Sequence, residues 1–134
     1  MEALIYTSRA RAMPTRRIVG DILEAAHRNN PAFGLTGMLL WAGSTFAQLL
    51  EGEAGSLDAM WRRLSADDRH EEVRLLMRWP LDERFFAEWS MADSQMPAPA
   101  HWELLERSAG EDDPAFALWI LQLMNDAHRA DGRS

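Results

Sequence analysis

The chain contains no cysteine and no lysine. Without thiols it has no disulfide, no thiolate metal site, no CxxC redox pair and no cysteine nucleophile, and we expect a reducing compartment. All 14 basic residues are arginine, and 21 acidic residues outnumber them to give a net charge of −7. This balance argues against nucleic acid or an anionic membrane as the main partner, because both attract basic proteins.

Long apolar runs and targeting signals are also missing. No window is apolar for long enough to cross a bilayer, and the first residues do not resemble a secretory signal. We therefore expect a cytoplasmic protein. Its 134 residues suffice for one compact domain with a single core.

Motifs of the common enzyme classes are absent as well: GxSxG, the P-loop, HExxH and GxGxxG. The four histidines have no metal-ligand spacing; they are His27, His70, His101 and His128. We expect no metal site.

The first 33 residues predict a strand followed by a helix. Residues 4–8 are β-prone, and a helix that opens near Pro14 is indicated by apolar residues at helical spacing: Ile18, Ile22, Leu23 and Ala26. We expect this helix to stop at residues 29–31, Asn-Asn-Pro, because the residue before a proline is disfavoured in the α region.

The next segments predict a hairpin, a helix and a strand. Residues 38–41 and 46–50 are β-prone runs around turn residues 42–44. A second helix is expected to be capped by Ser56, with an apolar face made of Leu57, Met60, Trp61 and Leu64. Residues 73–79 predict a largely buried strand, and residues 85–92 a fifth one.

The resulting β-α-β-β-α-β order predicts a ferredoxin-like α+β fold, an antiparallel sheet with two helices on one face. After Pro97 and Pro99 the pattern becomes helical, first over residues 102–107. A longer helix follows, with Asp113 as its cap and Pro114 in its first turn.

This last helix has an apolar stripe made of Phe116, Trp119, Ile120, Leu123, Met124 and Ala127. We expect the stripe to cover the open face of the sheet. Leu118 and Leu121 lie outside it, and this additional apolar surface predicts contact with another subunit or a partner.

Two polar residues lie inside apolar strand patterns. Tyr6, the only tyrosine of the chain, is in the first predicted strand, and Gln48 shares a strand face with Phe46 and Leu50. One interpretation is a core aromatic residue and an interior amide with satisfied hydrogen bonds. The other interpretation is a functional pair.

Six short strings in the first 95 residues together resemble the BLUF family, blue-light sensors that use FAD. They are LIYTS (4–8), NNP (29–31), GLTGML (34–39), FAQLLEG (46–52), DDRH (67–70) and WSM (89–91). The resemblance covers residues 2–95 and implies the same ferredoxin-like fold. It divides the chain into a flavin-binding domain, residues 1–95, and a C-terminal helical cap, residues 96–134.

The resemblance implies a photoactive pair. Tyr6 matches the family's tyrosine, which gives an electron to the excited flavin and then loses its proton. Gln48 matches the glutamine between that phenol and flavin N5 and C4=O, where an amide both donates and accepts. Rotation or tautomerisation of the Gln48 amide would then produce a small red shift without a covalent bond.

Further residues match the family's contacts to the flavin ring. Asn30 matches the residue that pairs with the C4=O and N3–H edge, because a carboxamide and an imide each offer a donor and an acceptor side by side. Asn29 is expected to assist it. Ile22 and Leu64 match the apolar walls on either side of the ring.

By the same resemblance, Arg63 and Asp67 face the C2=O edge and the ribityl chain, and Arg69 and His70 lie near the phosphates. For Arg69 and His70, a solvated turn is an equally good interpretation. FAD is the expected cofactor, and FMN or riboflavin would share the ring contacts.

Trp89 and Met91 match a variable pair on the fifth strand, one of which approaches Gln48 in the family. We expect this strand to carry the signal towards the C-terminal helices. The chain resembles short BLUF proteins that have no attached output domain, which implies a separate output protein as partner and a homo-oligomer.

Two other functions are compatible with the fold. One is an acylphosphatase-type or flavin-reductase-type enzyme, which is disfavoured because the chain has neither a phosphate-cradling loop nor a nicotinamide motif. The other is a colourless dimerisation or regulatory module. The sequence favours a photoreceptor over an enzyme.

Overall fold

The computed structural model describes residues 1–10, 16–42, 45–66, 70–86, 92–95 and 114–132. Its elements, in chain order, are β1 (Glu2–Ala10), α1 (Arg16–Phe33), β2 (Thr36–Ala42), β3 (Thr45–Gly52), α2 (Ala54–Ser65), β4 (His70–Pro80), β5 (Ala92–Gln95) and α4 (Pro114–Gly132). The predicted β-α-β-β-α-β order is confirmed. The predicted segment at residues 102–107 lies outside the described residues.

The strands form one sheet in the order β4-β1-β3-β2-β5. The first four strands pair antiparallel, as the predicted fold requires. β5 instead runs parallel to β2, with Met38 opposite Ala92. The sheet is therefore an antiparallel ferredoxin-like unit with a short parallel edge strand.

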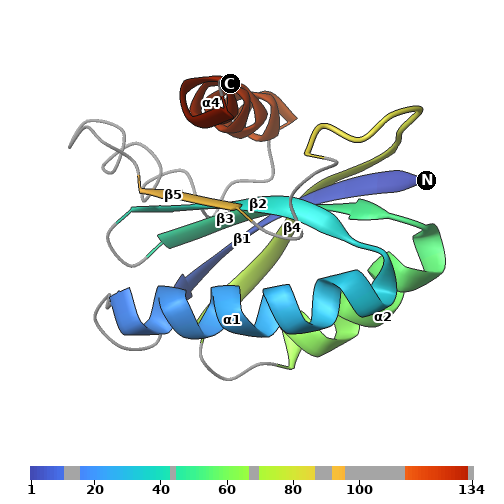
Figure 1. Ribbon diagram of the computed structural model, residues 1–134. Helices are drawn as coiled ribbons and strands as arrows, with labels where there is room; N and C mark the ends of the chain where they lie inside the picture. Colours follow the sequence, from blue (N-terminus) through green and yellow to red (C-terminus); the bar gives the residue numbers. More distant parts are fainter. Residues whose placement is uncertain (11–15, 43–44, 67–69, 87–91, 96–113, 133–134) are drawn as a thin grey trace.

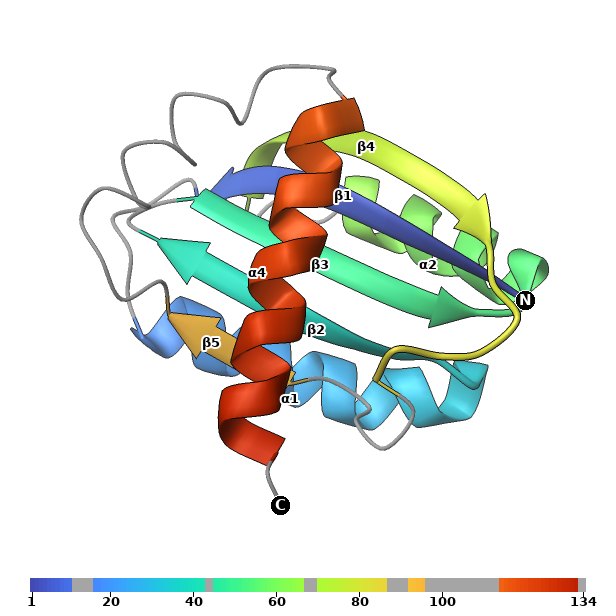
Figure 2. The same ribbon diagram turned by 90° about the horizontal axis from the view of Figure 1, so that it is seen from above.

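Helices cover both faces of this sheet. Figure 1 shows α1 and α2 on one face and α4 on the other, and Figure 2 shows α4 crossing over the central strands. Because side chains alternate along a strand, β1 to β4 each contribute to two apolar cores, in place of the single core expected from the chain length. On β1, Ile5 belongs to the core under α4, whereas Leu4 and Tyr6 belong to the core under α1 and α2.

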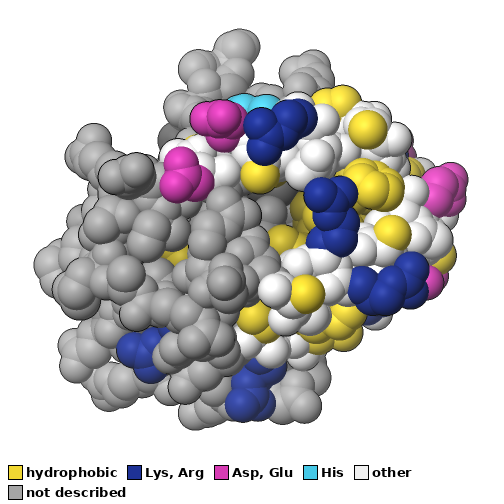
Figure 3. Space-filling view, turned by 90° about the horizontal axis from the view of Figure 1, so that it is seen from below, with side chains coloured by type: hydrophobic (Ala, Val, Ile, Leu, Met, Phe, Trp, Pro, Cys, Tyr) yellow, Lys and Arg dark blue, Asp and Glu magenta, His cyan; other side chains and the backbone are white. Residues whose placement is uncertain are grey.

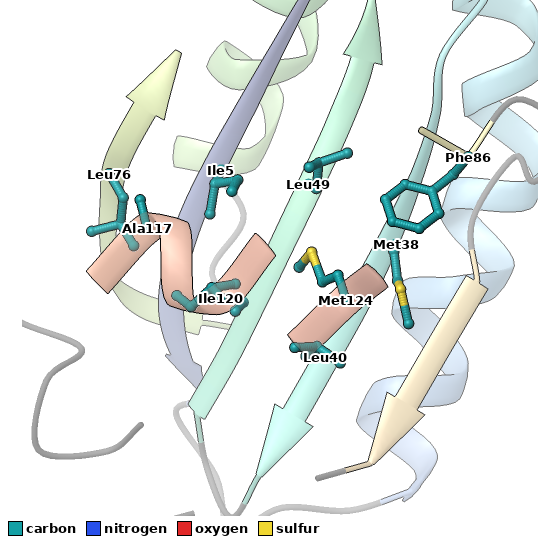
Figure 4. Packing of buried hydrophobic residues seen from close by; sticks show 10 residues of the cluster. Ile5, Met38, Leu40, Leu49, Leu76, Phe86, Ala117, Ile120 and Met124 are labelled. Atoms are coloured by element: carbon teal, nitrogen blue, oxygen red, sulfur yellow. The ribbon is translucent and has the colours of Figure 1, made fainter. Parts of the chain in front are cut away.

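The core under α4 confirms that the last helix covers the open face of the sheet. Ala117, Ile120 and Met124 of α4 are fully buried, and Figure 4 shows them facing strand residues such as Ile5 and Leu49. Leu118 is 56 % exposed, whereas Leu121 packs partly against this core.

The predicted end of α1 is wrong, because the helix continues through Pro31 to Phe33. Gly34 ends it with φ +69°, a left-handed conformation that glycine adopts without steric cost. The Gly34 N–H donates to the Pro31 carbonyl (3.1 Å), and the Leu35 N–H donates to the Asn30 carbonyl (2.8 Å). This Schellman arrangement satisfies the carbonyls of Asn30 and Pro31 and ends the helix two residues beyond the proline.

The predicted start of α2 is also wrong. The helix begins at Ala54, and its N-cap is Glu53, which makes no side-chain capping bond. Ser56 therefore lies inside the first turn, where the Leu57 N–H donates to the Glu53 carbonyl at 3.0 Å. The predicted apolar face is confirmed, since Leu57 and Met60 are buried.

Two strand predictions need correction. β4 is an edge strand of the sheet, so it is not largely buried: Leu75 is 39 % exposed, although Leu76 is buried. Of the predicted fifth strand, residues 85–86 are not in a strand and Ala92 lies in β5, whereas residues 87–91 lie outside the described residues. Phe86 is buried ahead of that strand in the core under α4.

The connection after β4 is tied to the sheet by a buried carboxyl group. The Glu51 side chain is fully buried and accepts hydrogen bonds from the Thr36 hydroxyl (2.8 Å) and from the Phe85 and Phe86 N–H groups (2.5 and 3.1 Å). Arg84 donates to the Thr36 hydroxyl and to the Gly34 carbonyl, each at 2.8 Å. These bonds place Phe86 over the ends of β2 and β3.

A second polar cluster joins β4 to β1 and α2. Arg78 binds Glu2 at 2.5 Å and Asp58 at 2.7 Å. The hydrogen bond that Arg78 donates to Asp58, and then the one that it donates to Glu2, raise the pKa of Arg78 above its usual value. In the part of the chain that the structure describes, no helix has the length and apolar character needed to cross a membrane.

Candidate functional site

Tyr6 and Gln48 lie directly opposite each other on β1 and β3. Both point to the sheet face that α1 and α2 cover, and they are 1 % and 3 % exposed. The Tyr6 hydroxyl donates a hydrogen bond to Gln48 Oε1. The structure thus brings together the two polar residues that the sequence analysis identified, as a buried pair joined by one hydrogen bond.

The arrangement of this pair follows from strand geometry. Directly opposed residues of antiparallel strands have neighbouring side chains on one face. β1 and β3 stay in register from Glu2–Gly52 to Arg9–Thr45, and a one-residue slip of either strand would turn its polar side chain to the other face, away from the partner. The long apolar pairing around them therefore determines where the phenol and the amide meet.

Asn30 is placed near the end of α1 with its side chain facing inward. It is 2 % exposed, whereas its neighbour Asn29 is half-buried. The continuation of α1 through Pro31 keeps Asn30 on helical backbone, and its carbonyl accepts the bond from Leu35 that ends the helix. A buried carboxamide on this face offers both a donor and an acceptor.

α2 brings Arg63 and Leu64 to the same side of the sheet. The Arg63 guanidinium lies 5.7 Å from the centre of the Phe33 ring, so it links α2 to the end of α1. Leu64 is half-buried and packs against the core under α1 and α2. The Arg63 side chain is otherwise exposed, so its charge lies at the edge of the site.

The other predicted site residues lie outside the described part of the structure, either entirely or in their side chains. Asp67, Arg69, Trp89 and Met91 lie outside the described residues. Ile22 lies in α1 and His70 pairs with Ala10 at the start of β4, but the side chains of both are outside the described part.

The sequence interpretation missed the contact between Trp61 and Tyr6. Trp61 is half-buried on α2, and its ring meets the Tyr6 ring edge to face, with centroids 5.5 Å apart and planes at 73°. The periodicity predicted only that Trp61 belongs to an apolar helix face. The contact could have been suspected because that face had to pack on the strand that carries Tyr6.

The face formed by α1 and α2 combines apolar and basic groups. Figure 3 shows hydrophobic side chains and arginines side by side on it. Among the described side chains of these helices, the exposed arginines are Arg28, Arg62 and Arg63. Arg28 lies 3.8 Å from Glu24 on the same helix, so Arg62 and Arg63 in the last turn of α2 place positive charge beside the apolar groups of this face.

The donor set fits a flavin. Its ring has an imide edge with a donor and an acceptor side by side, as the buried Asn30 carboxamide also has, and its remaining surface is apolar, like Leu64 and the neighbouring core. Among the described residues, no group of three His, Asp or Glu side chains could hold a metal ion.

Comparison with known proteins agrees with this geometry. The profile of the family described as "Sensors of blue-light using FAD" (BLUF) matches residues 1–92. The solved structure "BlrB - a BLUF protein, dark state structure" superposes with a TM-score of 0.72 at 32 % identity, over 83 % of this chain and 87 % of that one.

Two curated relatives are longer proteins. Photoactivated adenylate cyclase subunit alpha of Euglena gracilis is 35 % identical over 78 residues, 58 % of this chain and 8 % of the relative. Blue light- and temperature-regulated antirepressor BluF of Escherichia coli K12 is 34 % identical over 73 residues, 54 % of this chain and 18 % of the relative. The chain spans less than a fifth of the length of each.

The matched residues include the buried Tyr6, Asn30 and Gln48, and the fold agrees with that of BlrB. The chain therefore belongs to the BLUF family of flavin-binding blue-light sensors.

Proposed function

We propose that this chain is a blue-light receptor in which Tyr6 and Gln48 form the photoactive pair. The observation that supports this most directly is the hydrogen bond from the Tyr6 hydroxyl to Gln48 Oε1 in a site shielded from water. Such a pair can move a proton over one bond and return it.

The residues proposed to hold the flavin come from three elements. Gln48 and Asn30 would pair with the N5, C4=O and N3–H side of the ring, with Asn29 assisting. Leu64 would contact one face of the ring and Ile22 the other. FAD is the proposed cofactor, and FMN or riboflavin would make the same ring contacts.

Polar groups at the rim would bind the rest of the cofactor. Arg63 and Asp67 are proposed for the C2=O edge and the ribityl chain, and Arg69 and His70 for the phosphates. The exposure of Arg63 at the edge of the site supports this placement. Arginine suits phosphate because its planar fork donates two parallel hydrogen bonds.

When bound, the flavin would absorb blue light and supply the one-electron acceptor. Tyr6 would donate the electron, and the existing hydrogen bond would let its phenolic proton move to Gln48 Oε1. The Gln48 side chain would then rotate, or pass an N–H proton to the same acceptor and become the imidic tautomer, so a different group would face the ring. Return of one electron and one proton from that acceptor would restore the Tyr6 O–H bond, and the change that persists would be the new hydrogen bonding of Gln48.

The altered Gln48 is proposed to signal through β5. β5 pairs with β2, and β2 pairs with the strand that carries Gln48. Trp89 and Met91 precede β5, and either one would contact the Gln48 amide. Residues 96–134 are proposed as a helical cap on the 1–95 flavin domain that passes the signal to a separate output protein, in a homo-oligomer without enzymatic activity of its own.

Absorption spectra in the dark, directly after blue light and during recovery test the proposal. We expect flavin absorption that shifts slightly to the red and returns. Tyr6→Phe should abolish the shift while retaining the flavin, since the chain has no second tyrosine. A normal shift in Tyr6→Phe, or light that only bleaches the flavin to reduced forms, would overturn the mechanism.

The β5 route needs its own variant. Met91→Ala should change the dark recovery or weaken the response of the partner protein. If Met91→Ala leaves both the spectral shift and the regulation of the partner unchanged, this strand is excluded as the route of the signal.

A further inference from the structure

Trp61 contacts the phenol ring of Tyr6 from the helix side. Its ring lies 5.5 Å from the Tyr6 ring at an interplanar angle of 73°, a favourable edge-to-face geometry. Trp61 is half-buried on α2, and Tyr6 is 1 % exposed on β1. The contact therefore joins a helix to the residue proposed to donate the electron.

Two contacts from different elements act on the Tyr6 side chain. At its tip, the hydroxyl donates to Gln48 Oε1 of β3, and along its ring it meets Trp61 of α2. A tyrosine side chain has only two rotatable bonds, so one contact at the tip and one at the ring restrict both. The hydroxyl bond fixes the tip of the side chain, and Trp61 is one of the neighbours in the core under α1 and α2 that fix the tilt of its ring.

We propose that Trp61 is a positioning residue for Tyr6: it holds the phenol so that the hydroxyl stays on Gln48 Oε1. The fraction of molecules with the photoactive hydrogen bond in place is then set by α2 as well as by the sheet. Aromatic pairs of this geometry contribute enough to change that population about two- to tenfold. The photochemical consequence rests on the proposed function, whereas the positioning itself does not.

NMR tests the positioning directly. Because Tyr6 is the only tyrosine, protein carrying ring-labelled tyrosine gives signals from this one residue. In Trp61→Leu, we expect the Tyr6 ring signals to lose the shift caused by the neighbouring indole and to broaden or double. Trp61→Phe keeps an aromatic ring and should retain a single narrow set.

Trp119→Phe is the matched control, since Trp119 is also half-buried but lies on α4, on the other side of the sheet. It should leave the Tyr6 signals in place. Tyr6 signals in Trp61→Leu that coincide with those of the parent would overturn the proposal. Equal changes in Trp119→Phe and Trp61→Leu would do so too, because they would indicate a general loss of packing.

The same variants give a photochemical readout. Per absorbed photon, Trp61→Leu should form about two- to tenfold less of the red-shifted state, and Trp61→Phe should restore most of it. An undiminished yield in Trp61→Leu would show that the contact has only a structural role. A parent protein with no reversible shift would overturn the proposed function instead, and the NMR comparison would still decide the positioning.

Discussion

Replacing Glu51 should destabilise the protein more than its single carboxyl group suggests. This side chain is fully buried and accepts three hydrogen bonds, from the Thr36 hydroxyl and from the Phe85 and Phe86 N–H groups. The Thr36 hydroxyl can rotate to another acceptor, but the two backbone N–H groups cannot. Glu51→Ala therefore leaves the buried Phe86 N–H and the partly buried Phe85 N–H without their acceptor.

An unsatisfied buried donor costs about 1–3 kcal/mol, so Glu51→Ala should lower the free energy of unfolding by about 4 kcal/mol. Glu51→Gln keeps the shape of the side chain but presents an NH2 group to one of the donors. It should cost about 1–3 kcal/mol. Domains of this size are stable by about 5–15 kcal/mol, so both effects are measurable.

Urea unfolding followed by circular dichroism measures these differences. Glu53→Gln is the matched control, because the Glu53 side chain is 80 % exposed and lies only 3.7 Å from the N-terminal amine. That substitution should change stability by less than about 0.5 kcal/mol. If Glu51→Gln unfolds at the same urea concentration as Glu53→Gln, the hydrogen-bond reasoning is refuted.

Hydrogen exchange gives a second test that does not depend on Glu51→Ala folding. The Phe85 and Phe86 amides of the parent should exchange slowly although they lie in a connection between strands, because Glu51 accepts from both. In Glu51→Gln, at least one of them should exchange faster. Fast exchange of both amides in the parent would show that the Glu51 bonds do not hold this segment.

Three further substitutions test the fold. Gly37→Ala should cost about 3 kcal/mol or more in urea unfolding, because a Cβ there would lie 2.1 Å from the Leu49 carbonyl oxygen; a cost below about 1 kcal/mol would contradict this packing. Gly34→Ala should cost about 1–2 kcal/mol in the same assay, because φ at this position is +69°, and an unchanged midpoint would argue against the left-handed helix end. Arg78→Met should cost about 1 kcal/mol and make stability less sensitive to salt, measured by unfolding at low and high ionic strength. Folding raises the pKa of Arg78. The stability that Arg78 contributes is therefore complete below its unfolded-state pKa and is lost only as the pH rises through its higher folded-state pKa. Titration of Arg78 should thus leave the free energy of unfolding unchanged near neutral pH.

The sequence alone predicted the order of the elements, because the signals for them are local. Strand periodicity and helical spacing indicate which face of a segment is apolar. That apolar face must be buried, whichever other segment it packs against. The same reasoning identified Tyr6 and Gln48 as polar exceptions on inward faces. It also predicted that α4 would cover the sheet, from the stripe that contains Ile120 and Met124.

Element ends were less predictable, because capping depends on bonds that the local pattern does not specify. Asn-Asn-Pro was expected to end α1, but the bonds from Gly34 and Leu35 carry the helix to Phe33. This extension keeps Asn30 on helical backbone, with its side chain buried. β4 looked buried by composition, yet its place at the sheet edge leaves Leu75 exposed.

Only the tertiary structure decided which side chains meet. Tyr6 and Gln48 are 42 positions apart and become neighbours through the register of β1 and β3. The approach of Trp61 to Tyr6 depends on how α2 packs on the sheet, and the burial of Glu51 depends on a connection more than 30 positions later in the chain. Periodicity determines which face of a segment is buried, whereas register and packing, which are long-range, determine what that face contacts.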